Sequence, residues 1–316
     1  MKMDSSQFEN IRKWIYRNAR PVDLARWQFH FENGSMENVL HALSAYQNED
    51  GGFAHAYEPD FWNPNSTGLQ TWFAIELLWE IKAQDSRHPL IQGILRYLEC
   101  EASGFMENKW VSELESTNDY PHAPWWHWRE QEFGIPATVA AFAARHAEKG
   151  SLLYEKARSY VKTSAATFMQ RTGSNEYDFM EYIRLYQCCI ESGDNIFDTD
   201  AYADKINLIM VQNLSEPKID WLDPAVLDCI KAYTNNFPAV LQDCHKKTIV
   251  ENLLNIMNSD GIWGFVYYGW PTHYKGLEFK KYPLEEALST NWWMAYKTIM
   301  NTLIIKQLNC LQDYSV

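Results

Sequence analysis

Gln47-Asn48-Glu49-Asp50-Gly51-Gly52-Phe53 separates two stretches of sequence that carry different helical patterns. Residues 36–46 place apolar side chains at three- and four-residue spacing, which predicts a helix with one buried face. The Asp-Gly-Gly sequence ends that helix, because glycine accepts the left-handed backbone of a helix C-terminus. A second helix is predicted to begin at Ser66 or Thr67, and residues 70–79 are apolar on nearly every side, as in a helix buried between neighbours. The unit is an amphipathic helix, a Gln-x-x-x-Gly-x-aromatic turn and a more buried helix.

The composition favours a chain with a large core and an aromatic-lined ligand site. Of the 316 residues, 46% are hydrophobic, yet no apolar run is long enough to predict a membrane span. The absence of a secretory signal and of any Cys-x-x-Cys among six cysteines favours a cytoplasmic protein with reduced thiols. The formal net charge of −13 argues against nucleic acid as a partner. The 14 Trp, 18 Tyr and 15 Phe suit walls around an apolar or carbohydrate ligand.

The helix pair recurs along the chain. Helical spacing or helix-start signals mark residues 8–20, 90–98, 134–142, 151–170, 176–191, 202–212, 223–224, 249–256 and 289–296, while residues 21–35 are expected to connect two units. Successive helix ends lie roughly 40–70 residues apart, which is typical of helix-pair repeats with loop insertions. The sequence therefore predicts an all-α fold over residues 1–316 as a single domain, with about 10–12 helices in two concentric layers.

Two of the turns resemble those of a known superfamily. Gln47-x-x-x-Gly51-x-Phe53 and Met257-x-x-x-Gly261-x-Trp263 are similar to the Gln-Trp repeats of terpenoid cyclases and protein prenyltransferases. The start of the second helix, residues 64–77, is similar to the inner helices of that superfamily. The resemblance implies an (α/α)6 toroid, in which outer helices enclose inner helices around a deep aromatic cavity. A generic repeat of helical pairs is the alternative interpretation.

The catalytic motifs of that superfamily are absent. The sequence lacks both Asp-x-Asp-Asp, which protonates substrates, and Asp-Asp-x-x-Asp, which holds magnesium and pyrophosphate. Asp223, Cys229 and His273 are the residue types of the zinc site, but the flanking residues and the spacing from Asp223 to Cys229 do not match. We therefore expect no metal and no other cofactor, and the motifs leave the reaction open.

Candidate site residues lie in the loops that precede the inner helices. In a closed ring these loops emerge on one face, so we expect the largest pocket at the ring centre, lined by at least three of them. The candidate catalytic residues are Glu58, Asp60, His122 and Asp178. The candidate substrate-binding residues are Tyr57, Trp62, Trp125, Trp126, Trp128, Tyr177, Trp270 and His273.

Two classes of enzyme fit these residues. In the first, the substrate is an isoprenoid or another large apolar molecule, aromatic walls stabilise a developing carbocation, and a carboxylic acid of raised pKa donates the proton. In the second, a carbohydrate-active toroid stacks tryptophans on sugar faces and pairs Glu58 or Asp60 with Glu176 or Asp178 as acid and base. A non-catalytic protein that binds either ligand is the third alternative.

Overall fold

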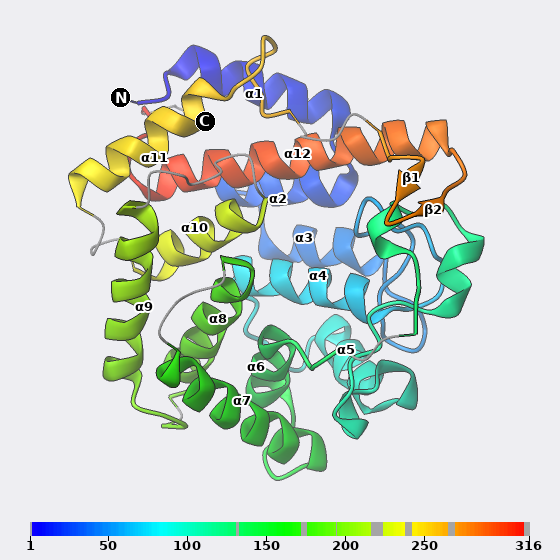
Figure 1. Ribbon diagram of the computed structural model, residues 1–316. Coiled ribbons are helices and arrows are strands. Elements are labelled where there is room, and N and C mark those ends of the chain that lie inside the picture. Colours follow the sequence, from blue (N-terminus) through cyan, green and yellow to red (C-terminus); the bar gives the residue numbers. More distant parts are fainter. Residues whose placement is uncertain are drawn as a thin grey trace.

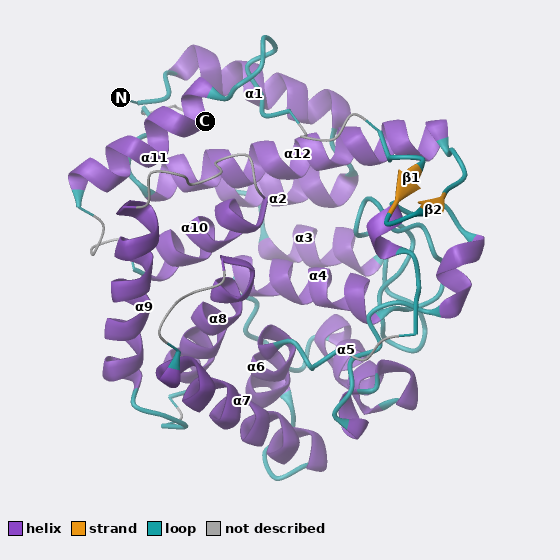
Figure 2. Ribbon diagram, viewed as in Figure 1, coloured by secondary structure: helices purple, strands orange, loops and turns teal. Residues whose placement is uncertain are grey.

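The computed structural model describes residues 2–130, 133–171, 176–193, 195–215, 224–237, 242–264 and 269–312, without the side chains of residues 176–178, 213–215, 224–226 and 235. Over these ranges the regular secondary structure is almost entirely helical, which confirms the all-α prediction (Figures 1 and 2). None of the described helices is both long enough and apolar enough to cross a membrane.

The described helices fall into two interleaved sets. The odd-numbered helices are α1 (Ser5–Asn18), α3 (Met36–Ser44), α5 (Pro89–Glu99), α7 (Leu152–Gln170), α9 (Thr199–Ser215) and α11 (Asp243–Asn255). The even-numbered helices are α2 (Pro21–Phe31), α4 (Gly68–Glu80), α6 (Ala137–His146), α8 (Glu176–Ser192), α10 (Pro224–Asn236) and α12 (Pro283–Gln307). The connections contain the 3-10 helices η1 (Glu101–Ser103), η2 (Phe105–Glu107), η3 (Glu115–Asp119) and η4 (Pro124–Trp126), and an antiparallel hairpin of β1 (His273–Tyr274) and β2 (Leu277–Glu278).

The even-numbered helices are neighbours in space. In sequence order, α4 contacts α6, α6 contacts α8, α8 contacts α10, α10 contacts α12, and α12 contacts α2. An ion pair joins α2 to α4, with both Arg26–Glu80 hydrogen bonds at 2.6 Å. The odd-numbered helices α1, α7 and α9 lie toward the edge of the view in Figure 1. Near the two ends of the chain, the Met3 N–H donates to the Cys310 carbonyl at 2.9 Å, so the first and last described segments meet.

Burial follows the difference in sequence pattern between the two sets. The outer face of α1 is polar, and its buried residues form one stripe of Phe8, Ile11 and Ile15. Helix α4 instead buries ten of its side chains, including the polar Gln70 and Thr71. Helix α1 is therefore buried along one stripe and α4 on most of its sides, as their sequence patterns predict.

The turn after α3 is fixed by one glycine and one glutamine. Gly51 has φ +92°, and a Cβ on it would lie 1.9 Å from the carbonyl oxygen of Gly93 in α5. Gln47 Nε2 donates to the carbonyls of Gly51 and Leu90, both at 2.9 Å. Gly261 also has a positive φ, +73°, although a Cβ there would meet open space. The predicted left-handed conformation is confirmed at both glycines, and the turn at Gly51 docks on the start of α5.

Two predicted boundaries are wrong. Residues 21–35 do not merely connect two helices, because Pro21 at the first helical position and Asp23 in the first turn start α2. Helix α12 does not begin at residues 289–290, because Pro283 and two glutamates in the next turn start it earlier. Ser289 is therefore a buried residue inside α12 rather than its cap.

Candidate functional site

Two of the predicted loops converge. Residues 60–62, between α3 and α4, pair in antiparallel fashion with residues 121–123, between α5 and α6. The Ala123 N–H donates to the Asp60 carbonyl at 2.8 Å, and the Trp62 N–H donates to the Pro121 carbonyl at 3.0 Å. This pairing places Glu58, Asp60 and Trp62 beside the segment that carries the candidate residues from His122 onward, as the sequence predicts.

The backbone just before Glu58 is strained and is held by Arg20. His55 and Ala56 have φ of +62° and +57°, a region that residues with a Cβ occupy at a cost of about 1 kcal/mol or more each. Arg20 Nη1 donates to the carbonyls of Ala56 and Tyr57, both at 2.9 Å, while its Nε donates to Asp23 Oδ2 at 2.7 Å. Arg20, which directly precedes α2, therefore holds the turn that leads into Glu58.

The Glu58 side chain is fully buried and incompletely hydrogen bonded. Its Oε2 accepts a hydrogen bond from the Asp60 N–H at 2.9 Å, whereas Oε1 has no partner among the described residues. Burial, and next the charge of Asp60, raise the pKa of Glu58 well above its usual range. The Trp126 indole partly offsets this rise in pKa, although it does not reach hydrogen-bonding geometry with the carboxyl. Burial thus favours the protonated acid of Glu58 over its carboxylate.

Asp60 is the second buried carboxyl of the loop. Its Oδ1 accepts a hydrogen bond from Trp270 Nε1 at 3.0 Å, which brings the segment before α12 to the site. Burial raises the pKa of Asp60 to about 6, and the hydrogen bond from Trp270 limits the rise. Neither Asp60 nor Glu58 forms an ion pair with any residue that the structure describes. Burial therefore raises the pKa of both carboxyls, and no salt bridge within the described residues holds either one as a carboxylate.

An indole stack closes one side of this loop. Trp62 and Trp292 stack with their ring centroids 5.3 Å apart, and the Arg20 guanidinium lies 5.1 Å from the Trp292 centroid. Both Trp62 Nε1, at 3.0 Å, and the Ser289 hydroxyl donate to the Pro59 carbonyl. The loop is thus held against α12.

Sequence reasoning missed three of these residues. Arg20 precedes a helix that the pattern read as a connection, and Ser289 was read as a cap. Trp292 has an identical neighbour, and a pair of tryptophans is explained by core packing alone. Trp293 is indeed buried, whereas Trp292 is half-buried and stacks on a candidate residue. The Arg-Pro start of α2 was the available signal for Arg20.

His122 forms a second, neutral cluster. Its Nδ1 lies 2.7 Å from the Tyr120 carbonyl oxygen, and its Nε2 lies 3.2 Å from His127 Nδ1. Burial lowers the pKa of His122, and the Phe279 ring packs edge-on against both imidazoles. The Nδ1 contact requires a proton on that atom, so the neutral ring presents Nε2 as an acceptor.

Other predicted residues lie elsewhere. Tyr57 packs its ring into the core against Tyr46, with centroids 5.3 Å apart. Trp125 is half-buried in η4, which contacts β1, and His273 is an exposed residue of β1. Trp128 lines a separate pocket.

Several predicted residues lie outside the description. Tyr177, Asp178 and Glu176 belong to α8, but their side chains are among those not described. Asp223 also lies outside the described residues, while Cys229 is buried in α10. Among the described side chains, no group of three or more His, Cys, Asp and Glu residues could hold a metal ion.

The cavity between the even-numbered helices is small and charged. It offers about 20 Å³ to a water molecule, enough for roughly one. Its charged lining residues come from helices α2, α4 and α10, and from the residue before α2: Arg20, Asp23, Arg26, Glu76, Glu80 and Lys231. Of the predicted loops, only the one between α3 and α4 lines this cavity, through Tyr57 and Pro59. The expectation that at least three loops line the central pocket is therefore wrong for this cavity. Long side chains fill the space because they pair with each other across it.

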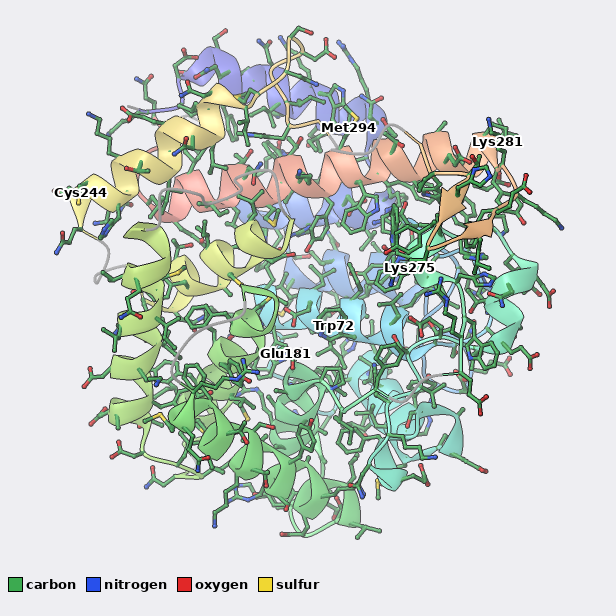
Figure 3. All side chains as sticks on the ribbon, viewed as in Figure 1. Trp72, Glu181, Cys244, Lys275, Lys281 and Met294 are labelled. Carbon is green, nitrogen blue, oxygen red and sulfur yellow. The ribbon has the colours of Figure 1, made fainter. Side chains whose placement is uncertain are left out.

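Figure 3 shows the side chains around this region. Trp72 of α4 and Glu181 of α8 lie near the middle of the view. Lys275, in the turn of the hairpin, lies to the right of the middle, and Lys281, just before α12, lies at the upper right edge. The Glu181 carboxylate accepts a hydrogen bond from the Ala137 N–H at 2.5 Å, which caps α6. Comparison of the chain with protein-family models, curated proteins and solved structures gave no match.

Proposed function

We propose that the chain is an (α/α)6 toroid of the terpenoid cyclase and prenyltransferase type. The even-numbered helices would form the inner layer and the odd-numbered helices the outer layer. The succession of contacts from α4 to α12 and on to α2 supports this arrangement, as does the Arg26–Glu80 link between α2 and α4. The meeting of Met3 with Cys310 is the contact that a closed ring needs between its first and last units.

Within this toroid we propose an enzyme that transfers a proton from Glu58 to its substrate. The observation that carries the proposal is the buried Glu58–Asp60 pair, whose outer oxygen, Glu58 Oε1, has no partner among the described residues. A protonated Glu58 has a proton to donate, and the Asp60 N–H remains to stabilise the carboxylate that forms. Asp60, with its pKa raised to about 6, is suited to accept the proton that the substrate cation loses at the end of the reaction.

The substrate proposed for this acid is an isoprenoid or another large apolar molecule. Protonation of a carbon–carbon double bond produces a carbocation, which the faces of aromatic rings attract. Indoles surround the carboxyl pair: Trp126 and Trp270 border the two carboxyls, and Trp62 stacks on Trp292. Indole rings in these positions would stabilise the carbocation. They carry no basic group that would remove a proton from it before the reaction is complete.

A carbohydrate substrate is the second candidate, and one observation favours it. Glu58 and Asp60 are two carboxyls in one loop, bordered by the indoles of Trp126 and Trp270, and paired carboxyls are also the acid and base of glycoside hydrolysis. In that case Glu58 would protonate a glycosidic oxygen and Asp60 would act as the second carboxylate.

Product analysis distinguishes the two substrates. We would incubate the purified protein with squalene, geranylgeraniol and a set of nitrophenyl glycosides, and analyse the products by gas chromatography–mass spectrometry and by absorbance. A converted polyprene is expected, with Glu58→Gln lowering kcat about 100- to 10,000-fold. Glu49→Gln, at an exposed residue on the preceding turn, is the matched control and should keep full activity. Conversion that survives Glu58→Gln, or no conversion of any probe, would contradict the assignment of the acid.

A further inference from the structure

A second pocket lies apart from the Glu58 site. It has a volume of about 570 Å³, within the range of small-molecule sites, and is formed by residues 109–113, residues 128–130 and Phe133. The Trp110 N–H donates to the Phe133 carbonyl at 3.0 Å, which ties the two sides of the pocket together. The pocket thus belongs to the long connection between α5 and α6 rather than to the inner helices.

The aromatic wall of the pocket is held in place by the start of α4. The Gly68 N–H donates to the Val111 carbonyl at 2.9 Å. A Cβ on Gly68 would lie 2.8 Å from the Trp110 ring, so that ring packs directly on the helix terminus. Trp128 is half-buried, and its backbone N–H donates to Asn118 Oδ1 at 3.0 Å. One firmly packed indole and one partly open indole therefore line the same space.

Glu113 brings to the pocket a buried carboxyl that accepts hydrogen bonds from its own backbone N–H and from the Ser112 side chain. Its side chain is nine-tenths buried and lines the pocket, yet it forms no ion pair with any described residue. Burial raises the pKa of this carboxyl to about 7. Lys109 and Arg129 line the same pocket. A buried carboxyl of this kind gains most from a ligand that donates a hydrogen bond to it.

The charges of the lining residues restrict the ligand. Lys109 and Arg129 disfavour an organic cation, and Glu113 and Glu130 disfavour a phosphate or carboxylate. An uncharged ligand with one apolar face and several hydroxyl groups meets both conditions. We propose that this pocket binds a saccharide, with a sugar ring stacked on Trp128 and a sugar hydroxyl donating to Glu113.

Binding assays on the full chain test this proposal separately from catalysis at Glu58. We would titrate the protein with maltose, cellobiose and diacetylchitobiose and follow binding by calorimetry and saturation-transfer NMR. At least one disaccharide should bind, and both Trp128→Ala and Glu113→Gln should weaken its binding about tenfold or more. Glu49→Gln is the matched control, since Glu49 does not line this pocket, and it should leave the affinity unchanged. Trp62→Ala tests instead whether the sugar binds at the Glu58 loop.

Three results would overturn the proposal. The first is that none of the disaccharides binds, and the second is that binding survives both pocket substitutions. The third is loss of binding in Trp62→Ala but not in Trp128→Ala, which would move the sugar to the Glu58 loop. Only that third result would favour carbohydrate as the substrate there. Because Glu113→Gln keeps the shape of the side chain, it remains informative if the truncation at Trp128 disturbs folding.

Discussion

Substitution of Glu80 by glutamine should cost more stability than any surface charge change in this chain. The Glu80 carboxylate accepts two hydrogen bonds from Arg26 at 2.6 Å, and it also contacts His30 at 2.8 Å and Lys231 at 3.0 Å. Arg26 and Lys231 are about as buried as Glu80 itself. Glu80→Gln keeps the volume of the side chain but leaves these cations without the charge that balances them.

The size of the effect follows from which partner is left unpaired. Lys231 keeps Asp228 at 3.0 Å, whereas Arg26 keeps only the face of the Tyr296 ring, 4.5 Å from its guanidinium carbon. Removing one partner of a buried ion pair costs about 3–5 kcal/mol, mainly through the unpaired charge. We therefore expect a loss of about 3–5 kcal/mol at pH 7.

The same site gives the effect a defined pH dependence. Burial alone would raise the pKa of Glu80, but Arg26, Lys231 and His30 hold it well below its usual range. A carboxyl with a lowered pKa in the folded state stabilises the fold above its unfolded pKa of about 4.3, and loses that contribution as the pH falls. The difference between the wild type and Glu80→Gln should therefore shrink below about pH 4.

Urea unfolding followed by tryptophan fluorescence measures both effects. The control is Glu9→Gln, because the Glu9–Arg12 contact is long, at 3.8 Å, and largely exposed. We expect its cost to be about 0.5 kcal/mol or less. A loss below about 1 kcal/mol for Glu80→Gln at pH 7, or a loss that does not change with pH, would refute this account of the network.

Four further substitutions test the turns and the candidate site, each measured by urea unfolding. Gly51→Val should cost about 3 kcal/mol or more and Gly261→Val about 1 kcal/mol, because a side chain has space only at the second; equal costs would contradict the close approach at the first. Gln47→Ala should cost about 1–2 kcal/mol through the lost bonds to Gly51 and Leu90, with a smaller loss if water replaces them. Asp60, with its pKa raised to about 6, stabilises the fold below about pH 4 and loses that contribution as the pH rises through 6. Asp60→Asn should therefore remove up to about 3 kcal/mol of pH dependence, and an unchanged profile would show that this carboxyl is not buried as described.

Local signals in the sequence were sufficient for most helices. The predicted break between residues 170 and 176 separates α7 from α8, and Thr67 is the N-cap of α4. These boundaries depend on capping residues and glycines, which act over a few residues. Helix α2 was missed because its buried residues include Asp23 and Arg26, whose burial depends on partners far away in the sequence.

Some residues of the candidate site could also be predicted from the sequence, and others could not. Glu58, Asp60 and Trp270 could be selected because carboxyls and indoles gather in loops of one class, and the structure does bring these three together. The charged filling of the inner cavity could not be foreseen. Glu76 pairs with Arg184, more than 100 residues away, and such pairings leave no local pattern.

Helices α1 and α2 cannot complete their packing until the ribosome has synthesised α12. Helices α1 and α2 pack on α12, although α2 ends at Phe31 and α12 begins at Pro283. At about 5–20 residues per second, a ribosome needs roughly 10–50 s to translate the intervening segment. During that time α2 can pack on its neighbours α1 and α3, but the part of its surface that α12 covers has no final partner. Helices α6, α7 and α8 have no such delay, because they pack on one another as soon as they emerge.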